Sequence, residues 1–497
     1  MKKLPLLFII LAAAFTVACT NDSTDESSVI PPDQTPEHPT DPDEPTPPEV
    51  RTLSFANITD AEVLYLTTRK NDTARTEDEK QEPANTLFKI SYDGETEEVV
   101  FTDENGQPVE GVNVTAFRQM SDKYIYMSFD LVTDYESIPV GETTTEDPES
   151  GQLTTQIEYE YRPIYKHMQA VIQKSDGAAF KIDPIQLGGD EWTDIISERT
   201  EFQTDYNGNV YFIPQYSYNI YKIYTHGHEV YISQINRSDM TPAINTNYFT
   251  EWLVDRRGNV LINDQFLRLV SGEFATYEQI EYWSSNPNIF YAWNDSEGFY
   301  NMQLPAPNPT ETGSYKTDFV LYYCRPESPK TTWEQQKVLS LDGYISNLTN
   351  NPFKVFICEN KTILFHIQEE YIPGIKITVN DRDNITIEQL TQYTYPAGIE
   401  FKNYCKERYP YQEQYLYGMS SSEIWRLEIE TGRPELLYKY DDEFVIKSMS
   451  VKDGIVTFFA FELRKGNDVV AEIYPDKTVK VLESTNGDQI IYLERIN

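Results

Sequence analysis

Short runs of alternating apolar and polar residues cover most of the chain from about Arg51 onward. Examples are AEVLYLTT, TLFKISYDG, KYIYMSFD, NVYFIPQY, EVYISQI, KVFICEN and GIVTFFAFE. A period of two, filled with β-branched and aromatic residues, is typical of β-strands. Long amphipathic helical stretches are nearly absent. The pattern therefore predicts an all-β domain over residues 51–497.

Two short motifs recur along this domain. Asp205, Gly208, Asn209 and Val210 have counterparts in a second turn with the same spacing, Asp255, Gly258, Asn259 and Val260. Gly and Asn tolerate the positive φ of tight turns, so each copy predicts a turn that leads into an apolar strand. An apolar-aromatic-basic-aliphatic tetrapeptide also recurs, as LFKI (87–90), AFKI (179–182), IYKI (220–223) and IWRL (424–427), with FLRL (266–269) as a variant. Alternation predicts that its second and fourth residues face the core and its basic residue faces outward.

Strand units repeated at roughly 30 to 65 residues suggest the blades of a β-propeller. The Asp-x-x-Gly-Asn-Val turns resemble those of NHL-type and related propellers, a resemblance that concerns architecture and not activity. At about 60 residues per blade, the domain would hold about seven blades, with six or eight as close alternatives. The last strand, QIIYLERI, is expected to pair beside the first, AEVLYLTT, and thereby remove exposed sheet edges. Two or three β-sandwich domains are the alternative fold.

The N-terminal residues have a different pattern. Lys2 and Lys3 precede an apolar run from Leu4 to Ala18. At 1.5 Å per residue this run spans about 22 Å, short of the roughly 30 Å core of a bilayer. The basic start, short apolar run and small-residue end predict a secretory signal peptide over residues 1–18.

Thr16-Val17-Ala18-Cys19 is similar to the lipobox of bacterial lipoproteins. The resemblance implies cleavage before Cys19, which would then carry acyl chains such as palmitate on its sulfur and its new amino group. An ordinary signal peptide with an incidental cysteine is the alternative.

Residues 19–50 read as a tether, because they are rich in Pro, Asp and Glu and contain almost nothing that could form a core. A lipobox, acids soon after the cysteine (Asp22, Asp25, Glu26) and such a tether resemble surface-displayed lipoproteins of Bacteroides-type bacteria. The resemblance implies an outer-membrane protein that is lipid-anchored and faces the cell exterior. The periplasmic leaflet is the alternative location.

The charge of the chain limits the classes of partner that we expect. The chain holds 41 Lys and Arg against 80 Asp and Glu, for a net charge of −39. Such a chain is repelled by phosphate backbones, so nucleic acid is not an expected partner, and the lipid anchor is the expected contact with the membrane. Four cysteines do not make a disulfide scaffold. Whether two of Cys324, Cys358 and Cys405 pair is left open.

Signatures of chemistry are few. GxSxG, HExxH, CxxC and Walker motifs are absent, so no cofactor is predicted. His226 and His228 would share one side of a strand and could grip a metal, but an exposed turn explains them better, and no metal is predicted. Carboxylates suited to glycoside hydrolysis (Glu191, Asp194, Asp205, Asp255 and Asp295) are better explained as turn formers or solvated surface. No catalytic residue is predicted.

Aromatic residues are the most suggestive feature, with 36 Tyr and 6 Trp. Rigid aromatic rings make good platforms for sugars or peptides, although most should fill strand faces between blades. Residues near prolines and polar turns are the predicted ligand-binding set, namely Tyr216, Tyr218, Trp283, Trp293, Tyr409 and Tyr411. The leading hypothesis is a non-catalytic binding propeller for an extracellular glycan, peptide or partner protein. The alternatives are a propeller-fold glycoside hydrolase or polysaccharide lyase, and an assembly subunit of an outer-membrane complex.

Overall fold

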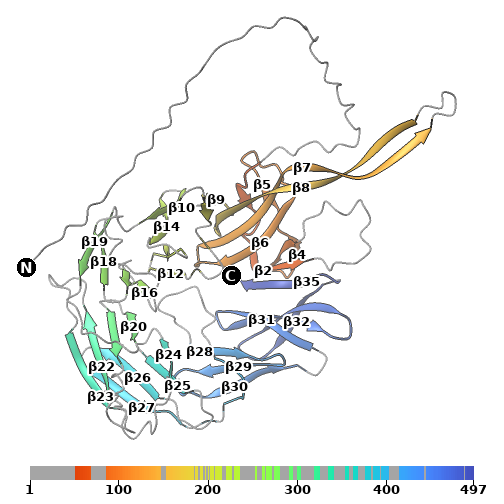
Figure 1. The fold of residues 1–497 in the computed structure, drawn as a ribbon. Helices are drawn as coiled ribbons and strands as arrows, with labels where there is room; N and C mark the ends of the chain where they lie inside the picture. The colour runs from red at the N-terminus through yellow and green to blue at the C-terminus, as the bar shows by residue number, and fades with distance from the viewer. Residues whose placement is uncertain are drawn as a thin grey trace, which may run out of the picture. The chain divides into compact units, whose positions relative to one another are not determined.

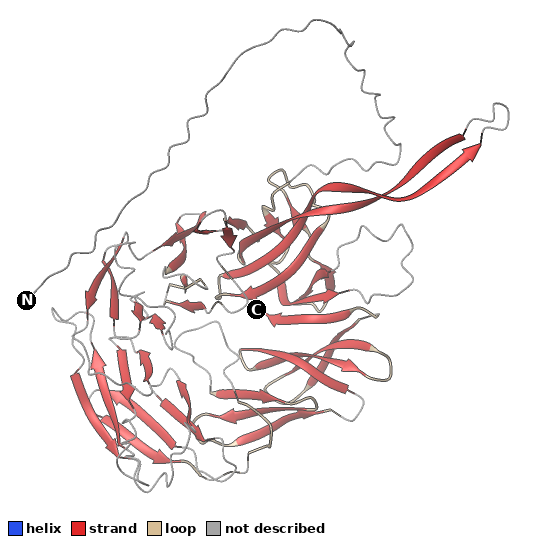
Figure 2. Cartoon of the chain, viewed as in Figure 1, coloured by secondary structure: helices blue, strands red, loops and turns tan. Residues whose placement is uncertain are grey.

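A computed structural model gives the fold, which Figure 2 shows as strands joined by loops. It describes residues 51–68, 85–146, 153–234 and 390–497, the last two with short gaps, and the strands between 235 and 389. Contacts divide the chain into the units Met1–Thr46 and Pro47–Asn497, and all described residues belong to the second. Within these ranges every regular element is a strand, and no helix is long and apolar enough to cross a membrane. The predicted signal peptide and tether, including Cys19, lie outside the described residues.

The described strands form eight successive antiparallel sheets of three or four strands, as expected of propeller blades (Figure 1). The predicted all-β propeller is thus confirmed, with one more sheet than the central expectation of seven and within the range of six to eight. The first sheet contains β35 (Gln489–Arg495), β2 (Ala61–Thr68), β3 (Asn85–Ser91) and β4 (Thr96–Glu98). The second contains β6 (Val112–Gln119), β7 (Tyr124–Glu146), β8 (Leu153–Gln173) and β9 (Ala179–Ile182).

Sheets three to five follow in chain order. The third contains β12 (Phe202–Thr204), β13 (Val210–Phe212), β14 (Tyr221–His226) and β15 (Glu229–Gln234). The fourth contains β16 (Trp252–Val254), β17 (Val260–Ile262), β18 (Gln265–Val270) and β19 (Phe274–Gln279). The fifth contains β20 (Phe290–Asn294), β21 (Phe299–Gln303), β22 (Asp318–Cys324) and β23 (Glu334–Ser340).

The last three sheets complete the order. The sixth contains β24 (Phe353–Ile357), β25 (Thr362–Ile367), β26 (Ile375–Asp381) and β27 (Asn384–Gln389). The seventh contains β28 (Tyr415–Met419), β29 (Glu423–Glu428) and β30 (Pro434–Lys439). The eighth contains β31 (Phe444–Lys452), β32 (Ile455–Glu462), β33 (Asn467–Ile473) and β34 (Val479–Ser484). Two further sheets have only two strands each and are separate from these eight. They are β1 (Phe55–Ala56) with β5 (Phe101–Thr102), and β10 (Ile185–Gly188) with β11 (Glu191–Thr193).

The two ends of the domain meet in the first sheet. β35 pairs antiparallel with β2, with Arg495 opposite Val63 and Leu493 opposite Tyr65. This pairing confirms the expected closure of the last strand on the first. It covers an edge of β2 that would otherwise be open to pairing with another chain.

The core lies between successive blades. One cluster joins the first and second sheets around Leu64, Phe117 and Phe129. In the eighth sheet, Phe458 packs toward the seventh sheet and the next residue, Phe459, packs toward the first. Neighbours therefore cover both faces of a blade, which is why β32 reads IVTFFAFE, apolar at almost every position.

This packing corrects the prediction for one copy of the recurring tetrapeptide, LFKI, whereas in AFKI the Lys181 side chain is exposed and Ile182 is buried, as predicted. In LFKI the first residue, Leu87, is buried, and so is the basic one, Lys89, at 4% exposure. The Lys89 ammonium forms ion pairs with Asp60 at 2.7 Å and Glu97 at 3.2 Å. The alternation rule assumes one solvated face, and this blade has none, so the lysine is accommodated by carboxylates instead of water.

The first copy of the repeated turn has the geometry that its sequence predicts, and residues 255–259 of the second copy lie outside the described residues. Gly208 has a φ of +74°, and its N–H donates to the carbonyl of Asp205 at 3.0 Å. The buried Asp205 carboxylate accepts from the N–H groups of Asn207 (2.8 Å) and Asn209 (3.1 Å). It also accepts from the Tyr211 hydroxyl at 3.0 Å. Asp205 therefore stabilises the turn, which is the explanation that the sequence favoured over a catalytic carboxylate.

One hairpin is much longer than the others. β7 and β8 pair from Tyr124 opposite Gln173 to Glu146 opposite Leu153, whereas β6 reaches only Leu131 and β9 only Gln169. Figure 1 shows the two strands continuing together past their neighbours. We call the extension, residues 132–165, the ribbon.

Candidate functional site

The aromatic residues proposed from the sequence are largely not tested. Trp293 lies in β20 opposite Tyr300, and its side chain is outside what the structure describes. The other proposed ligand-binding residues fall outside the described ranges, namely Tyr216, Tyr218, Trp283, Tyr409 and Tyr411. Their role stays a prediction.

The described residues place a different aromatic surface on the ribbon. Residues that pair across two strands share a face, and so do alternate residues of one strand. One face of the ribbon therefore carries Val132, Tyr135, Ser137, Pro139, Ile157, Tyr159, Tyr161, Pro163 and Tyr165. We call this set the aromatic face. Ile157, Tyr159 and Tyr165 are 41%, 38% and 45% exposed.

The opposite face, which we call the acidic face, carries Asp134, Glu136 and Glu160 together with Ile138, Arg162 and Ile164. The sequence contained this signal, because QIEYEYRPIY (156–165) alternates acidic with aromatic residues. From the sequence pattern alone, such a strand is predicted to lie half-buried in a sheet. The structure shows that no third strand flanks the described ribbon on either side.

Polar side chains extend the aromatic face toward the body of the second sheet. The Asp130 carboxylate lies 2.8 Å from His167 Nδ1, and the Ser128 hydroxyl lies 3.3 Å from His167 Nε2. The Thr115 hydroxyl lies 2.7 Å from that of Ser128. Residues on three neighbouring strands, β6, β7 and β8, thus form one row, which we call the polar row. Nothing in the chain order brings these types together, so the sequence did not reveal it.

Acyl transfer by a serine requires a base in contact with the serine, a carboxylate that orients the base, and hydrogen-bond donors for the oxyanion. The polar row has the first two. A serine contacts a histidine, and a carboxylate orients that histidine. However, Ser128 is only 6% exposed and lies on an interior strand, paired with Ala116 on one side and Gln169 on the other. The N–H groups of such a strand serve the sheet ladder and are not aimed at an oxyanion. The arrangement favours hydrogen bonding to a ligand over nucleophilic chemistry.

Tyr165 connects the two parts of the site. Burial raises the pKa of its hydroxyl, and the charges of Asp130 and Tyr135 raise it further. The phenol is a hydrogen-bond donor next to an apolar face.

A groove of about 500 Å³ lies beside the closing strand. Its lining includes Lys447, Phe459, Phe461, Asp468 and Asp488. The Lys447 ammonium lies 6.0 Å from the centroid of the Phe461 ring. Asp468 has a structural role, because its carboxylate accepts the N–H of Ile490 at 2.6 Å at the start of β35.

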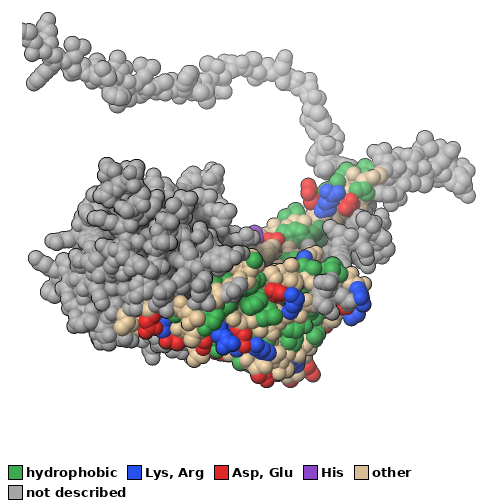
Figure 3. All heavy atoms as spheres, turned by 90° about the horizontal axis from the view of Figure 1, so that it is seen from below, with side chains coloured by type: hydrophobic (Ala, Val, Ile, Leu, Met, Phe, Trp, Pro, Cys, Tyr) green, Lys and Arg blue, Asp and Glu red, His purple; other side chains and the backbone are tan. Residues whose placement is uncertain are grey.

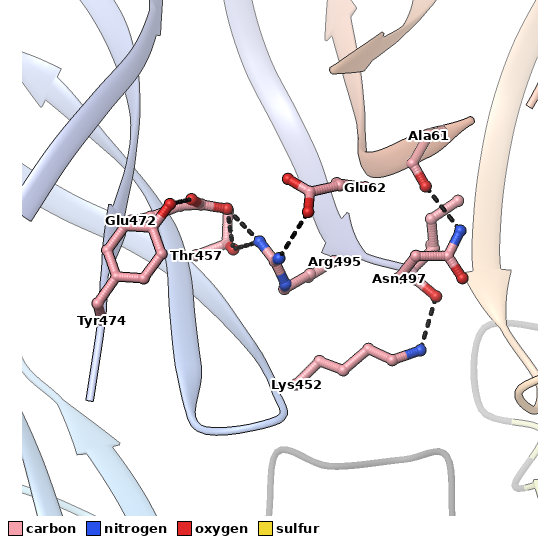
Figure 4. A network of polar contacts seen from close by, with 9 residues as sticks. Ala61, Glu62, Lys452, Thr457, Glu472, Tyr474, Arg495 and Asn497 are labelled. Carbon is pink, nitrogen blue, oxygen red and sulfur yellow. Dashed lines mark hydrogen bonds and ion pairs between the residues drawn. The ribbon is translucent and has the colours of Figure 1, made fainter. Parts of the chain in front are cut away.

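The closure also buries charge, and Figure 4 shows the polar contacts of these groups. Arg495 contacts Glu472 directly and lies 3.3 Å from Glu62, and the Tyr474 hydroxyl donates to Glu472 at 2.8 Å. That hydrogen bond is the main reason why the pKa of Tyr474 is raised to about 12. Burial raises the pKa of Glu62, and its attraction to Arg495 offsets only part of this.

Two lysines complete this closure. Lys174 and Lys452 both donate to the carbonyl of Ile496, the latter at 2.8 Å. These groups join the first, second and eighth sheets at the chain end. Their partners are other groups of the closure, so we assign the network to stability and not to chemistry.

Metal ligands do not gather in the described ranges, where no three His, Cys, Asp or Glu side chains are placed to hold an ion. His226 ends β14, and its exposed ring lies edge-on to Tyr231 at 6.3 Å between centroids. His228 lies outside the described residues.

Comparisons with known proteins give distant likenesses. No family model and no curated protein matches the chain. The propeller domain of the Trilobed protease from Pyrococcus furiosus is 10% identical, with a TM-score of 0.35 over 76% of this chain and 99% of that one. A quinonprotein alcohol dehydrogenase-like protein from Bacteroides thetaiotaomicron is 9% identical, with a TM-score of 0.30 over 87% and 99%.

A prolyl endopeptidase is 10% identical, with a TM-score of 0.35 over 59% of this chain, which spans 43% of the length of that enzyme. The activities named for these proteins are theirs. The propeller assignment follows from the strand order of this chain, eight successive sheets closed by β35.

Proposed function

We propose that this protein is a lipid-anchored β-propeller of the outer membrane that binds an extracellular ligand without transforming it. In this proposal Cys19 carries the lipid, residues 19–50 form the tether, and the propeller faces the cell exterior. The ligand is a glycan, a peptide or a partner protein, and the ribbon is the binding element.

The observation that supports binding is the exposed aromatic face. An isolated two-stranded hairpin is marginally stable in water, and apolar groups on it gain nothing from exposure. The ribbon nevertheless keeps three apolar residues of that face at 38% exposure or more. Contiguous apolar patches on monomeric proteins often mark a binding site.

A deletion tests the proposal. Leu131 and Lys166 face each other across the hairpin, so residues 132–165 can be replaced by Asn-Gly, which suits a two-residue hairpin turn. We expect this variant to unfold at the same temperature as the parent and to lose binding in a screen of glycans and envelope proteins. A matched control is Phe461→Ala in the groove, which keeps the ribbon intact. Undiminished binding by the deletion variant would contradict the proposal.

The anchor has a separate test. Growth with an alkyne analogue of palmitate should label the protein, and Cys19→Ala should abolish both the label and its sedimentation with membranes. Protease added to intact cells should degrade the propeller if it faces outward. Full protection would place it in the periplasmic leaflet.

A second candidate function, hydrolysis of an acyl ester, rests on the contacts among Ser128, His167 and Asp130. Its test is release of nitrophenol from nitrophenyl acetate by the full chain. Turnover that Ser128→Ala and His167→Ala both abolish would establish it. Turnover that persists in both variants, or none in the parent, would eliminate this function.

A further inference from the structure

The ribbon also indicates what kind of ligand it takes. We propose that the aromatic face docks side-on into an apolar groove of another protein whose rim is rich in Lys and Arg. This inference rests on the proposed function, because it names the partner of the same element.

The composition of the aromatic face favours a protein over a glycan. Sugar sites alternate aromatic rings with polar groups that bond the hydroxyls. Over the aromatic face itself, Ile157, Val132 and two prolines separate the tyrosines, and Ser137, opposite Tyr161, is a polar exception; the polar row lies at the base of the face, not between the rings. A continuous row of aliphatic and aromatic groups is complementary to an apolar protein surface.

The two strand edges argue against docking by strand addition. Each strand of the ribbon contains one proline, Pro139 in β7 and Pro163 in β8. A proline in an edge strand removes a donor that a third strand would need. Both edges are thus interrupted, which leaves the aromatic face as the surface for contact.

Charge distinguishes the partner from a second copy of this chain. Residues 132–166 hold eight acids and two bases, a net charge of −8 + 2 = −6. Figure 3 shows hydrophobic side chains beside acidic ones on the described surface. Two such ribbons, on chains of net charge −39, repel each other. A rim of Lys and Arg is complementary to this net negative charge of the ribbon, and steers association.

The size of the aromatic face indicates that the partner binds it in a groove. From Val132 to Glu142 the ribbon extends roughly 30 Å at about 3.3 Å per residue. A face about 10 Å wide then covers roughly 300 Å², less than half of the roughly 800 Å² that each side of a standard interface buries. A partner that also covers both edges reaches that area, and a flat partner does not.

Photocrosslinking identifies the partner. Benzoylphenylalanine is placed at position 159 on the aromatic face or at position 160 on the acidic face of the full chain, in the cell that makes it. We expect one envelope protein to be crosslinked from position 159 and not from position 160. Equal crosslinking from both positions, or none from either, would overturn the inference.

A matched pair of variants then measures the contact with that purified protein. Ile157 is 41% exposed on the aromatic face, and Ile164 is 44% exposed on the other. Because apolar anchors carry most of the energy of an interface, Ile157→Ser should weaken binding about tenfold and Ile164→Ser less than about twofold. Asp134→Asn with Glu136→Gln should reduce the salt dependence. Unchanged thermal unfolding shows that each variant is folded.

Other occupants give different results. Dimers of the full chain that Ile157→Ser dissolves would identify a second copy. Flotation of the chain without its lipid anchor on vesicles of phosphatidylethanolamine and phosphatidylglycerol would identify a membrane, and binding to a glycan array would identify a sugar. Each would overturn this inference while the ribbon deletion still supports the proposed function. Binding that survives that deletion would overturn both.

Discussion

Replacing Arg495 by methionine tests how the ends of the domain are joined. The Arg495 side chain is 5% exposed and that of Glu472 is 1% exposed, and they are in direct contact. Removing one member of a buried pair costs about 3–5 kcal/mol, because the other charge stays buried. Glu472 would keep hydrogen bonds from Tyr474 at 2.8 Å and Thr457 at 3.4 Å, each with a net contribution near 1 kcal/mol. The expected loss therefore lies at the lower end, about 3 kcal/mol.

The assay is equilibrium unfolding in urea, followed by intrinsic fluorescence. Arg495→Met with Glu472→Met should lose less than the single variant, because two apolar side chains replace the buried pair. Glu62→Gln is the control, since its carboxylate is 25% exposed and should contribute less than about 1 kcal/mol. A single-variant loss below about 1 kcal/mol, or a double variant at least as unstable as the single, would refute the reasoning.

Three further predictions concern turns and pH. Asp205→Ala should lower the free energy of unfolding by about 2–4 kcal/mol, and Asp205→Asn by less, because the amide keeps one acceptor oxygen; urea midpoints compare the two. Gly208→Ala should cost about 1 kcal/mol for its positive φ, and Gly177→Ala clearly more, because its Cβ would lie 2.0 Å from a backbone carbonyl oxygen; equal thermal shifts would contradict this. A hydrogen bond from Lys439 is the main reason why the pKa of Glu423 lies below its usual 4.5, so the ion pair stabilises the fold above that pH and its contribution is lost as the pH falls below it. Glu423→Gln should therefore be less stable than the parent at pH 7 and approach it as the pH falls below 4.5, as parallel thermal melts would show.

Local sequence patterns predicted much of the architecture. Period-two runs from AEVLYLTT to QIIYLERI predicted strands, because alternation is a property of neighbouring residues. The Asp205 to Val210 turn was readable for the same reason, since its hydrogen bonds span at most six residues. The closing pair, β35 on β2, could be inferred from the need to cover sheet edges.

The outcome differed where one residue's environment depends on another blade. Lys89 was expected to face solvent, but the face of β3 that carries it, with Leu87, packs on the second sheet, and Asp60 and Glu97 of its own blade pair with its ammonium. The Ser128 to Asp130 row needs His167, which comes from a different strand, and periodicity cannot show which side chains meet across strands.

The sequence by itself determined the strand-rich character, the Asp205 to Val210 turn and the acidic charge, all of which depend on composition or on residues close in the chain. Tertiary structure alone decided that β7 and β8 extend past their neighbours, and therefore that Tyr159 and Tyr165 are exposed on a ribbon. The physical reason is that the same alternation serves a strand in a covered sheet and a strand without neighbours. Only the lengths of the flanking strands β6 and β9 distinguish the two.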